Sequence, residues 1–325
     1  MKRQKLVRRL LWTVLVLFIL MNTVAFFHAY KFTHFDASPA KTKSAAQLSI
    51  ADKMHLALFG VSNPRPKAKA LPDTAYTTIR LRSNKEIECW WMRVQNPKGT
   101  VVLFHGYGGE KASLLNKGAI FRQLGYSTML VDFMGSGGSE GNQTTIGFKE
   151  AEQVKTCVQY LKESGVENII LFGTSLGAAA VMKAMNDEPL PVSTLILECP
   201  FSTMLQTVKN RFATMGIPAV PMAHLLVFWG GVQNGFNAYS HNPVAYARNI
   251  RCPVLLFYGA KDEKVTANET ANIFNNLAGL KKLVTFPQAG HENYLTKYKR
   301  EWTTEVAQFL NGNAKLVAQY PEVAN

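Results

Sequence analysis

Cysteine is scarce in this 325-residue chain, and the few cysteines do not form a recognisable site. There are four, at positions Cys89, Cys157, Cys199 and Cys252. No CxxC pair and no metal-ligand spacing occurs among them, so the sequence predicts neither a zinc motif nor a redox motif. Most lie in apolar runs, where a free cysteine packs as a small hydrophobic residue. The even count would also permit disulfides in an exported protein, and that alternative stays open.

Acidic residues are also few. The chain has 22 Asp and Glu against 36 Lys and Arg, which gives a formal net charge of +14. A basic surface attracts anionic lipid headgroups or acidic substrates, although a basic surface without a dedicated partner is equally compatible with this balance. The sequence contains no DNA- or RNA-binding motif, so we predict no nucleic-acid partner. The hydrophobic share of 47% indicates a well-packed globular domain.

One long hydrophobic run is present, near the N-terminus. Leu10 to Phe27 contains no charged residue, and about 18 helical residues cross most of a hydrocarbon core roughly 30 Å thick. Residues 1–9 form a strongly basic flank, which the positive-inside rule places in the cytoplasm. We therefore predict a single transmembrane anchor over residues 10–30, with the folded domain on the non-cytoplasmic side.

A cleaved signal peptide is the alternative to an anchor, and it would release a secreted protein. The boundary Phe27-His28-Ala29 has a bulky residue where a signal peptidase requires a small one. Ser38-Pro39-Ala40 fits that requirement better but lies far beyond the apolar run. The sequence therefore favours the anchor.

Residues 31–73 read as a stalk and lead-in. Within them Lys41 to Phe59 predicts a short amphipathic helix, which Asn63-Pro64-Arg65-Pro66 would end. The globular domain is expected over residues 74–312, followed by a C-terminal tail over residues 313–325.

From Thr74 onward, short apolar runs alternate with helical patterns. A hairpin of two strands is expected first, and the following apolar runs are typical of buried parallel strands. The predicted strands are Thr77–Leu81, Glu86–Val94, Thr100–Phe104, Ser127–Val131, Asn168–Phe172, Thr194–Leu197, Val254–Tyr258 and Leu283–Phe286. Helices are expected between most of them, for example over Lys149–Glu163 and Val265–Leu277. This alternation predicts an α/β fold with a mostly parallel, doubly wound sheet of about eight strands.

One connection breaks the alternation. Residues 201–249 contain no strand pattern, no Asp and no Glu, and a connection of this length usually has its own structure or function. We predict a small helical cap over the sheet edge. Most of its apolar side chains would pack the cap, with Phe201, Trp229 and Phe236 as candidates to line an acyl pocket.

Gly173-Thr174-Ser175-Leu176-Gly177 matches G-x-S-x-G and lies between an apolar run and a helical stretch. In that context the motif indicates a nucleophile elbow, a sharp strand-to-helix turn that exposes a serine hydroxyl. His105-Gly106-Tyr107 follows an earlier predicted strand, where an oxyanion loop is expected. The backbone N–H groups of Tyr107 and Leu176 are the candidate donors to the oxyanion. His105 itself is expected to form structural hydrogen bonds.

Asp262 and His291 complete the candidate site. Asp262 follows the predicted strand Val254–Tyr258, and His291 follows the last predicted strand. A serine, an acid and a histidine in this chain order characterise α/β-hydrolases. His291 would accept the proton of Ser175, and Asp262 would orient the imidazole. Glu198, which ends the strand before the cap, is the alternative acid.

These motifs together resemble the α/β-hydrolase superfamily over about residues 74–310. The matching segments are HGYGG, DFMGSGGS, GTSLG, ECPFS, CPVLLFYGAKDEKV and AGHEN. Within the superfamily they are similar to the branch of membrane-associated acyl-protein thioesterases and lysophospholipase-like enzymes. The resemblance implies a serine hydrolase that cleaves a carboxylic ester or thioester of an acyl, lipid-like substrate, without a metal or diffusible cofactor. A peptidase or amidase with the same three residues is one alternative, and a non-catalytic binding module on this fold is another.

Overall fold

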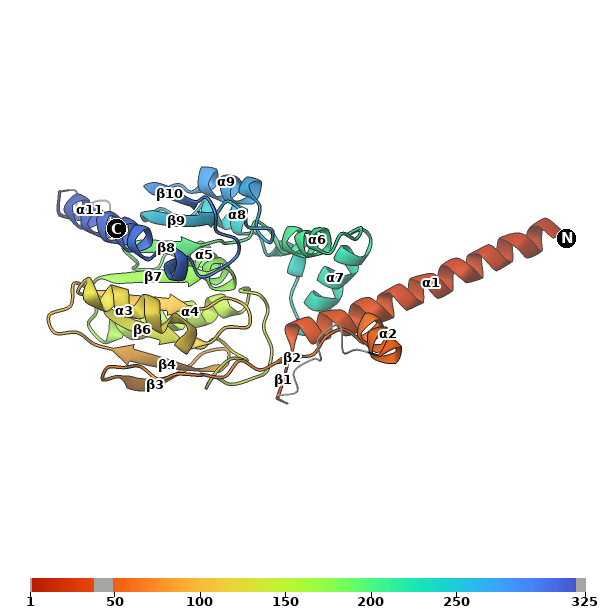
Figure 1. The fold of residues 1–325 in the computed structure, drawn as a ribbon, viewed down its shortest axis with the longest axis horizontal. Helices are drawn as coiled ribbons and strands as arrows, with labels where there is room; N and C mark the ends of the chain where they lie inside the picture. Colours follow the sequence, from red (N-terminus) through yellow and green to blue (C-terminus); the bar gives the residue numbers. More distant parts are fainter. Residues whose placement is uncertain (1, 38–48, 320–325) are drawn as a thin grey trace.

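An eight-stranded sheet forms the centre of the computed structural model, which describes residues 2–37 and 49–319 (Figure 1). Its strands, in chain order, are β3 (Thr77–Arg82), β4 (Glu86–Met92), β5 (Thr100–Phe104), β6 (Ser127–Val131), β7 (Ile169–Thr174), β8 (Thr194–Glu198), β9 (Val254–Gly259) and β10 (Lys281–Phe286). Across the sheet they run β10-β9-β8-β7-β5-β6-β4-β3. All pairs are parallel except those made by β4, which is antiparallel to β3 and β6. The predicted sheet, including its hairpin, is confirmed.

Continuous burial explains why the central strands appear in the sequence as uninterrupted apolar runs. Every residue of β5, β6, β8 and β9 is buried, as expected for strands covered on both faces. The edge strand β10 begins two residues before the predicted run, at Lys281. An edge strand tolerates such lysines because its outer side faces solvent.

Helices cover both faces of the sheet (Figure 1). One face is packed by α4 (Glu150–Glu163), α5 (Leu176–Asp187), α8 (Pro243–Ala247) and α9 (Ala267–Asn276). The opposite face is packed by α3 (Leu115–Gln123), α10 (Tyr294–Lys297) and α11 (Lys299–Gln319). The two predicted helices are thus confirmed, with ends shifted by one or two residues.

The N-terminal helix α1 (Lys2–Thr33) extends away from the sheet (Figure 1). It is the one helix, among the residues that the structure describes, long and apolar enough to cross a membrane. It continues three residues past the predicted end of the anchor. Ala25, Ala29 and Thr33 on one side of its last turns are buried against the rest of the protein, so this end of the helix belongs to the folded domain.

Much of the predicted stalk and lead-in packs on the rest of the protein. β1 (Phe35–Asp36) pairs with β2 (Asn63–Pro64), and the Phe35 amide donates to the Asn142 carbonyl at 2.6 Å. The Arg65 guanidinium donates to backbone carbonyls of residues 136–141. Every residue has a backbone carbonyl, so a sequence pattern cannot predict which carbonyls Arg65 contacts.

The predicted helix over Lys41 to Phe59 is described only in part. α2 (Ile50–Phe59) follows its N-cap residue Ser49, whose side chain accepts from the Asp52 amide in a capping box. This local N-cap fixes the start of the helix. The first part of the prediction, residues 41–48, lies outside the described residues, as does the end of the predicted tail, residues 320–325.

The cap consists of α6 (Met204–Thr214) and α7 (Met222–Asn234). α8, at the end of the predicted cap range, packs instead with α5 and α9 in the sheet layer. Trp229 of α7 contacts α1: its Nε1 donates to Asn22 Oδ1 at 3.1 Å. Phe236 stacks on Phe148, with ring centroids 4.6 Å apart. These two aromatic residues therefore join the cap to other elements.

A buried ion pair ties the sheet to the helices of one face. The Lys117 ammonium of α3 donates to Glu198 Oε2 at 2.6 Å, and both side chains are almost fully buried. Trp302 Nε1 of α11 donates to the other carboxylate oxygen, Oε1, at 2.8 Å. Loss of one partner would leave the other charge buried without compensation.

We expect Lys117→Met to destabilise the protein by about 3–5 kcal/mol, because Glu198 would remain buried and unpaired. The control is Lys282→Met, which breaks the half-exposed ion pair with Glu305 and should cost no more than about 1 kcal/mol. Denaturant unfolding of the full chain in detergent measures both. Equal stability losses in the two variants would contradict the role assigned to the buried pair.

Candidate active site

Ser175 lies at the turn between β7 and α5. Its backbone has φ 52° and ψ −109°, a conformation that a non-glycine residue adopts only when its surroundings impose it. The Ser175 amide donates to the Glu198 carbonyl at 2.8 Å, which attaches the turn to the end of β8. The strand–turn–helix context expected for the G-x-S-x-G motif is present.

The two motif glycines are required by close packing around this turn. A Cβ atom at Gly177 would lie 2.5 Å from the Phe104 carbonyl oxygen of β5, and one at Gly173 would lie 2.7 Å from the Ala178 amide nitrogen. Both neighbours are backbone atoms, which cannot move aside without shifting a strand or a helix. The glycines therefore let β5, β7 and α5 approach one another closely enough to form the turn.

Ser175, His291 and Asp262 lie in one hydrogen-bonded chain. Ser175 Oγ is 3.1 Å from His291 Nε2, and His291 Nδ1 is 2.7 Å from Asp262 Oδ2. Asp262 accepts two further hydrogen bonds at Oδ1, from the amides of Lys264 and Val265. With its carboxylate so fixed, Asp262 can accept a hydrogen bond from Nδ1–H of His291, a tautomer that leaves Nε2 free to accept the hydroxyl proton of Ser175.

The surroundings of His291 change its affinity for a proton. Burial lowers the pKa of the imidazole, whereas the neighbouring Cys199 and the hydrogen-bonded Asp262 carboxylate raise it, and the net shift is upward from 6.5 to about 10. The 2.7 Å contact with the Asp262 carboxylate supports the upward direction. The raised pKa means that His291 stays protonated to higher pH than a free histidine, and it can act as a general base only in its neutral form.

Leu176 directly follows Ser175, and Gly106, the neighbour of Tyr107 in the chain, packs against the Ser175 side chain. Tyr107 and Leu176 line a small cavity together with Gly106 and Phe35. Leu176 is the first residue of α5, so its N–H has no acceptor within the helix. Two backbone amides facing such a cavity could stabilise an oxyanion.

His105 forms the expected structural bonds: its Nδ1 is 2.8 Å from the Gly106 carbonyl, and its Nε2 accepts from the Phe133 amide.

The end of α1 contacts the loop that carries Tyr107. The Tyr107 hydroxyl donates to the Phe32 carbonyl at 2.8 Å, and the two rings stack with centroids 4.7 Å apart. Arg211 of α6 lies over the other partner of this stack, 5.0 Å from the Phe32 ring. Burial raises the pKa of the Tyr107 phenol, so the hydroxyl remains a donor. No sequence pattern indicates this contact between α1 and the candidate oxyanion loop.

The Glu198 carboxylate forms its hydrogen bonds with other residues and not with His291. It accepts from Lys117, Trp302 and the hydroxyl of Thr174, the residue before Ser175. The structure therefore brings Asp262, and not the alternative acid, to the histidine. Asp132 is likewise structural, since it binds the Lys111 ammonium and the Gly138 amide.

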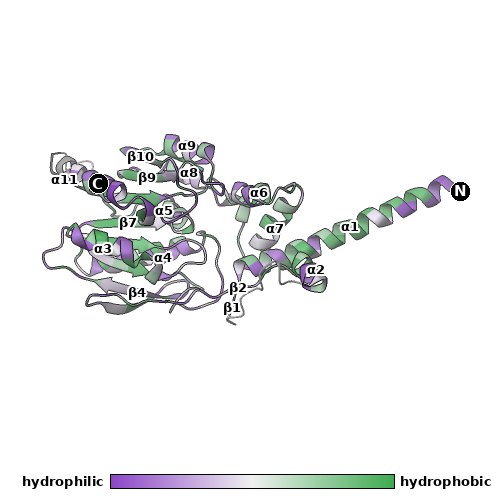
Figure 2. Cartoon of the chain, viewed as in Figure 1, coloured by the Kyte–Doolittle hydropathy of each residue, from purple (hydrophilic) through white to green (hydrophobic). Residues whose placement is uncertain are grey.

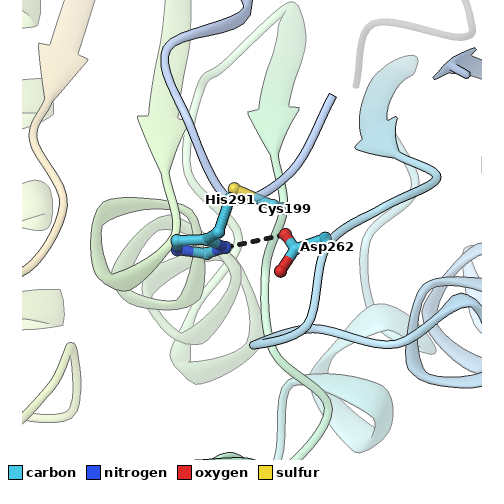
Figure 3. Close-up of side chains that lie close together, drawn as sticks. All are labelled: Cys199, Asp262 and His291. Carbon is cyan, nitrogen blue, oxygen red and sulfur yellow. Dashed lines mark hydrogen bonds and ion pairs between the residues drawn. The ribbon is translucent and has the colours of Figure 1, made fainter. Parts of the chain in front are cut away.

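Cys199 lies beside the Asp262–His291 pair, a neighbour that the sequence did not indicate (Figure 3). One potential ligand atom from each of Cys199, Asp262 and His291 lies within 4.8 Å of the others, and this is the one such group within residues 2–37 and 49–319. The direct hydrogen bond between Asp262 and His291 already satisfies both groups without a metal ion. Cys199 has φ 41°, so the turn after β8 directs its thiol to this place.

Gly177→Ala should distort the Ser175 turn, because the new methyl group would overlap the Phe104 carbonyl oxygen. We expect an unfolding free energy lower by about 2 kcal/mol or more. Gly230→Ala in α7 is the matched control, since no atom lies within 4 Å of the added Cβ. Thermal unfolding of the full chain compares the two. Normal stability of Gly177→Ala would contradict the packing argument.

Comparison with known proteins agrees with this architecture. The prolyl oligopeptidase family matches residues 113–316, a range that includes Ser175, Asp262 and His291. The chain is 24% identical over 230 residues to the protein YqkD of Bacillus subtilis, covering 70% of this chain and 75% of that protein. It is 26% identical over 212 residues to the lysophosphatidylserine lipase ABHD12 of Danio rerio, covering 61% of this chain and 52% of that lipase.

Among solved structures, an esterase of Pyrococcus furiosus has the same fold. The TM-score is 0.65 with 21% sequence identity, and the match covers 76% of this chain and 96% of the esterase. The fold, the strand order and the family match agree with the α/β-hydrolase resemblance of the sequence, and the chain belongs to the prolyl oligopeptidase family of α/β-hydrolases.

Proposed function

We propose that this protein is a membrane-anchored serine hydrolase that cleaves a carboxylic ester or thioester of an acyl, lipid-like substrate. The observation that carries the proposal is the hydrogen-bonded chain from Ser175 through His291 to Asp262, next to the loop of Tyr107. A serine with such a base and orienting acid is equipped for nucleophilic catalysis on an acyl group.

In the acylation half-reaction, Ser175 Oγ attacks the acyl carbonyl carbon while its proton passes to His291 Nε2. The carbonyl oxygen becomes an oxyanion and accepts from the amides of Tyr107 and Leu176; each such donor is typically worth about 3–4 kcal/mol. The intermediate then expels the alcohol or thiol, which takes the proton from His291. The product is an acyl ester of Ser175.

Deacylation repeats these steps with water. His291 removes a proton from the water molecule as its oxygen attacks the acyl-Ser175 carbonyl. The oxyanion again accepts from the two backbone amides, and Ser175 Oγ leaves with the proton held by His291. The free acid departs, and the serine is regenerated without a metal or a diffusible cofactor.

The lipid-like substrate follows from the setting of the site. A helix able to cross a membrane ends against the candidate oxyanion loop, and the cap is rich in apolar residues. The related Danio rerio protein is, by its name, a lysophosphatidylserine lipase. An acyl substrate at a membrane surface fits all three observations.

The anchor is proposed to remain uncleaved, with the basic N-terminus in the cytoplasm and the hydrolase domain on the opposite side. The burial of Ala25 and Ala29 and the Trp229–Asn22 hydrogen bond support retention of α1. A signal peptidase that removed this helix would expose the surfaces that these residues cover. A secreted, processed form remains the alternative proposal.

Peptidase activity is the second candidate function, because the family takes its name from an oligopeptidase. The same three residues could cleave an amide through an acyl-enzyme. The cap from residue 201 to 249 has no acidic residue, however, and therefore offers no carboxylate to bind a peptide's terminal amine. A matched ester and anilide of the same acyl group distinguish the two activities.

Ser175→Ala should abolish labelling by a fluorophosphonate probe and lower ester hydrolysis by about 10⁴-fold or more, since the nucleophile is removed. Ser164→Ala is the control, because Ser164 lies on the surface at the end of α4. The full chain in detergent is used, since α1 contacts the Tyr107 loop. Labelling that persists in Ser175→Ala would refute the proposed nucleophile.

The pKa of His291 predicts the pH dependence. The base works only when neutral, so its raised pKa means that kcat/KM keeps rising with pH beyond the ordinary value of 6.5. Asp262→Asn removes the negative charge, so the rising limb should move to lower pH and kcat should fall by about 10⁴-fold. Asp187→Asn, which alters only an ion pair with Lys183, should leave the profile unchanged. An unshifted limb in Asp262→Asn would contradict this assignment.

A further inference from the structure

The cap carries an apolar surface beside the membrane helix. Between Arg211 and Arg248 the sequence contains no Lys, Arg, Asp or Glu. Several large apolar side chains of this stretch are nevertheless exposed, and we call them the cap apolar face: Met215, Ile217, Val220, Phe228 and Val232. Figure 2 shows hydrophobic residues along α1 and on the cap elements next to it. A surface of this kind on a soluble domain marks an interaction site.

Contacts between α7 and α1 fix the height of this surface relative to a bilayer. Trp229 Nε1 donates to Asn22 Oδ1 at 3.1 Å, and Gln233 Nε2 donates to the Phe26 carbonyl at 2.8 Å. Both acceptors belong to the apolar run Leu10 to Phe27, which is the part of α1 that would cross the hydrocarbon. Because α7 is hydrogen-bonded to this run, the adjoining face of α7 lies at the same depth in the bilayer as the run does.

The depth can be estimated from helix geometry. At 1.5 Å per residue, the run of Leu10 to Phe27 is about 27 Å long, close to the roughly 30 Å of a hydrocarbon core. Asn22 lies five residues before the end of the run, hence about 8 Å inside it. Interfacial helices bury their apolar faces by about 5–10 Å, so the level of Trp229 fits insertion into one leaflet.

Exposed apolar side chains of the cap lie next to the residues of α7 that contact α1. Phe228 and Val232 are one helical turn apart on α7, and they directly precede Trp229 and Gln233, the residues that contact α1. Phe228 is 49% and Val232 54% exposed. On the other side of α1, Phe59 of α2 packs on Phe27 with ring centroids 5.1 Å apart. Apolar elements thus flank the outer end of the anchor.

We propose that the cap apolar face is immersed in the hydrocarbon edge of the leaflet from which α1 emerges, so that the occupant of this surface is the bilayer itself. If the proposed function holds, the substrate then enters from the leaflet and not from water. α6, which begins the cap, also bears Arg211 against Phe32, and Phe32 stacks on Tyr107. The immersed cap is therefore linked through one aromatic pair to the candidate oxyanion loop.

Depth measurement tests the immersion independently of activity. Full-length protein with Cys252→Ser is reconstituted in nanodiscs of phosphatidylcholine and phosphatidylglycerol, with a nitroxide at Val220→Cys or Ile217→Cys. The control is Leu280→Cys, because Leu280 is 53% exposed and precedes the edge strand β10. We expect labels at 217 and 220 to collide more with oxygen than with a water-soluble nickel chelate, and the label at 280 to show the reverse.

Other outcomes contradict the proposal. Labels at 217 and 220 as accessible to the nickel chelate as the label at 280 would place the cap in water. Protection from both oxygen and nickel would indicate that protein, such as a second copy of this chain, covers the surface.

Activity tests the route of the substrate. Val220→Asp and Phe228→Asp should lower hydrolysis of a long-chain ester in nanodiscs by at least about tenfold, because a carboxylate resists insertion into hydrocarbon. Hydrolysis of a water-soluble short-chain ester should persist, and Leu280→Asp should alter neither rate. Equal losses on both esters would overturn entry from the leaflet. If the wild type cleaves neither ester, the proposed function fails while the depth measurement still decides immersion.

Discussion

The backbone conformation of Ser175 is the constraint around which the site is organised. A residue with φ 52° and ψ −109° costs on the order of 1–3 kcal/mol unless its neighbours impose the turn. Here Gly173 and Gly177 permit the close approach of strands and helix, and the Glu198 carbonyl holds the Ser175 amide. The Glu198 carboxylate is fixed in turn by Lys117 and Trp302. The half-buried Ser175 is therefore supported by the packed core beneath it.

A second constraint comes from outside the sheet. Loops that carry functional groups are usually more mobile than the elements that they connect, but Tyr107 is held from two sides. His105 bonds within its own loop and to the Phe133 amide, and the last turn of α1 supplies the Phe32 carbonyl and ring. The end of α1 therefore stabilises the loop of the candidate site, independently of any role in a membrane.

The sheet and the motif residues could be predicted because they depend on local patterns. Buried strands appear as apolar runs, and the Ser175 turn requires glycines at fixed spacing. The choice between Asp262 and Glu198 could not be settled in this way, since both follow a strand at the same sheet edge. The choice depends on a distant residue. Lys117, 81 positions before Glu198 in the chain, binds the Glu198 carboxylate and holds it in the core. The Trp229–Asn22 contact joins residues 207 positions apart, and Cys199 reaches His291 only through the turn after β8.

In the proposed membrane-anchored protein, the length of α1 links the bilayer to the candidate active site. Its 32 residues make a rod of about 48 Å, whereas a hydrocarbon core needs only about 30 Å. The apolar run ends at Phe27, yet burial in the protein already begins at Ala25 and continues to Thr33. If α1 crosses a membrane as proposed, the same rigid helix belongs to both environments over this overlap, and the domain is held at a fixed distance from the bilayer. Helix geometry then also fixes the distance from the leaflet to Ser175, which is the physical basis for proposing a substrate that reaches the site from the bilayer.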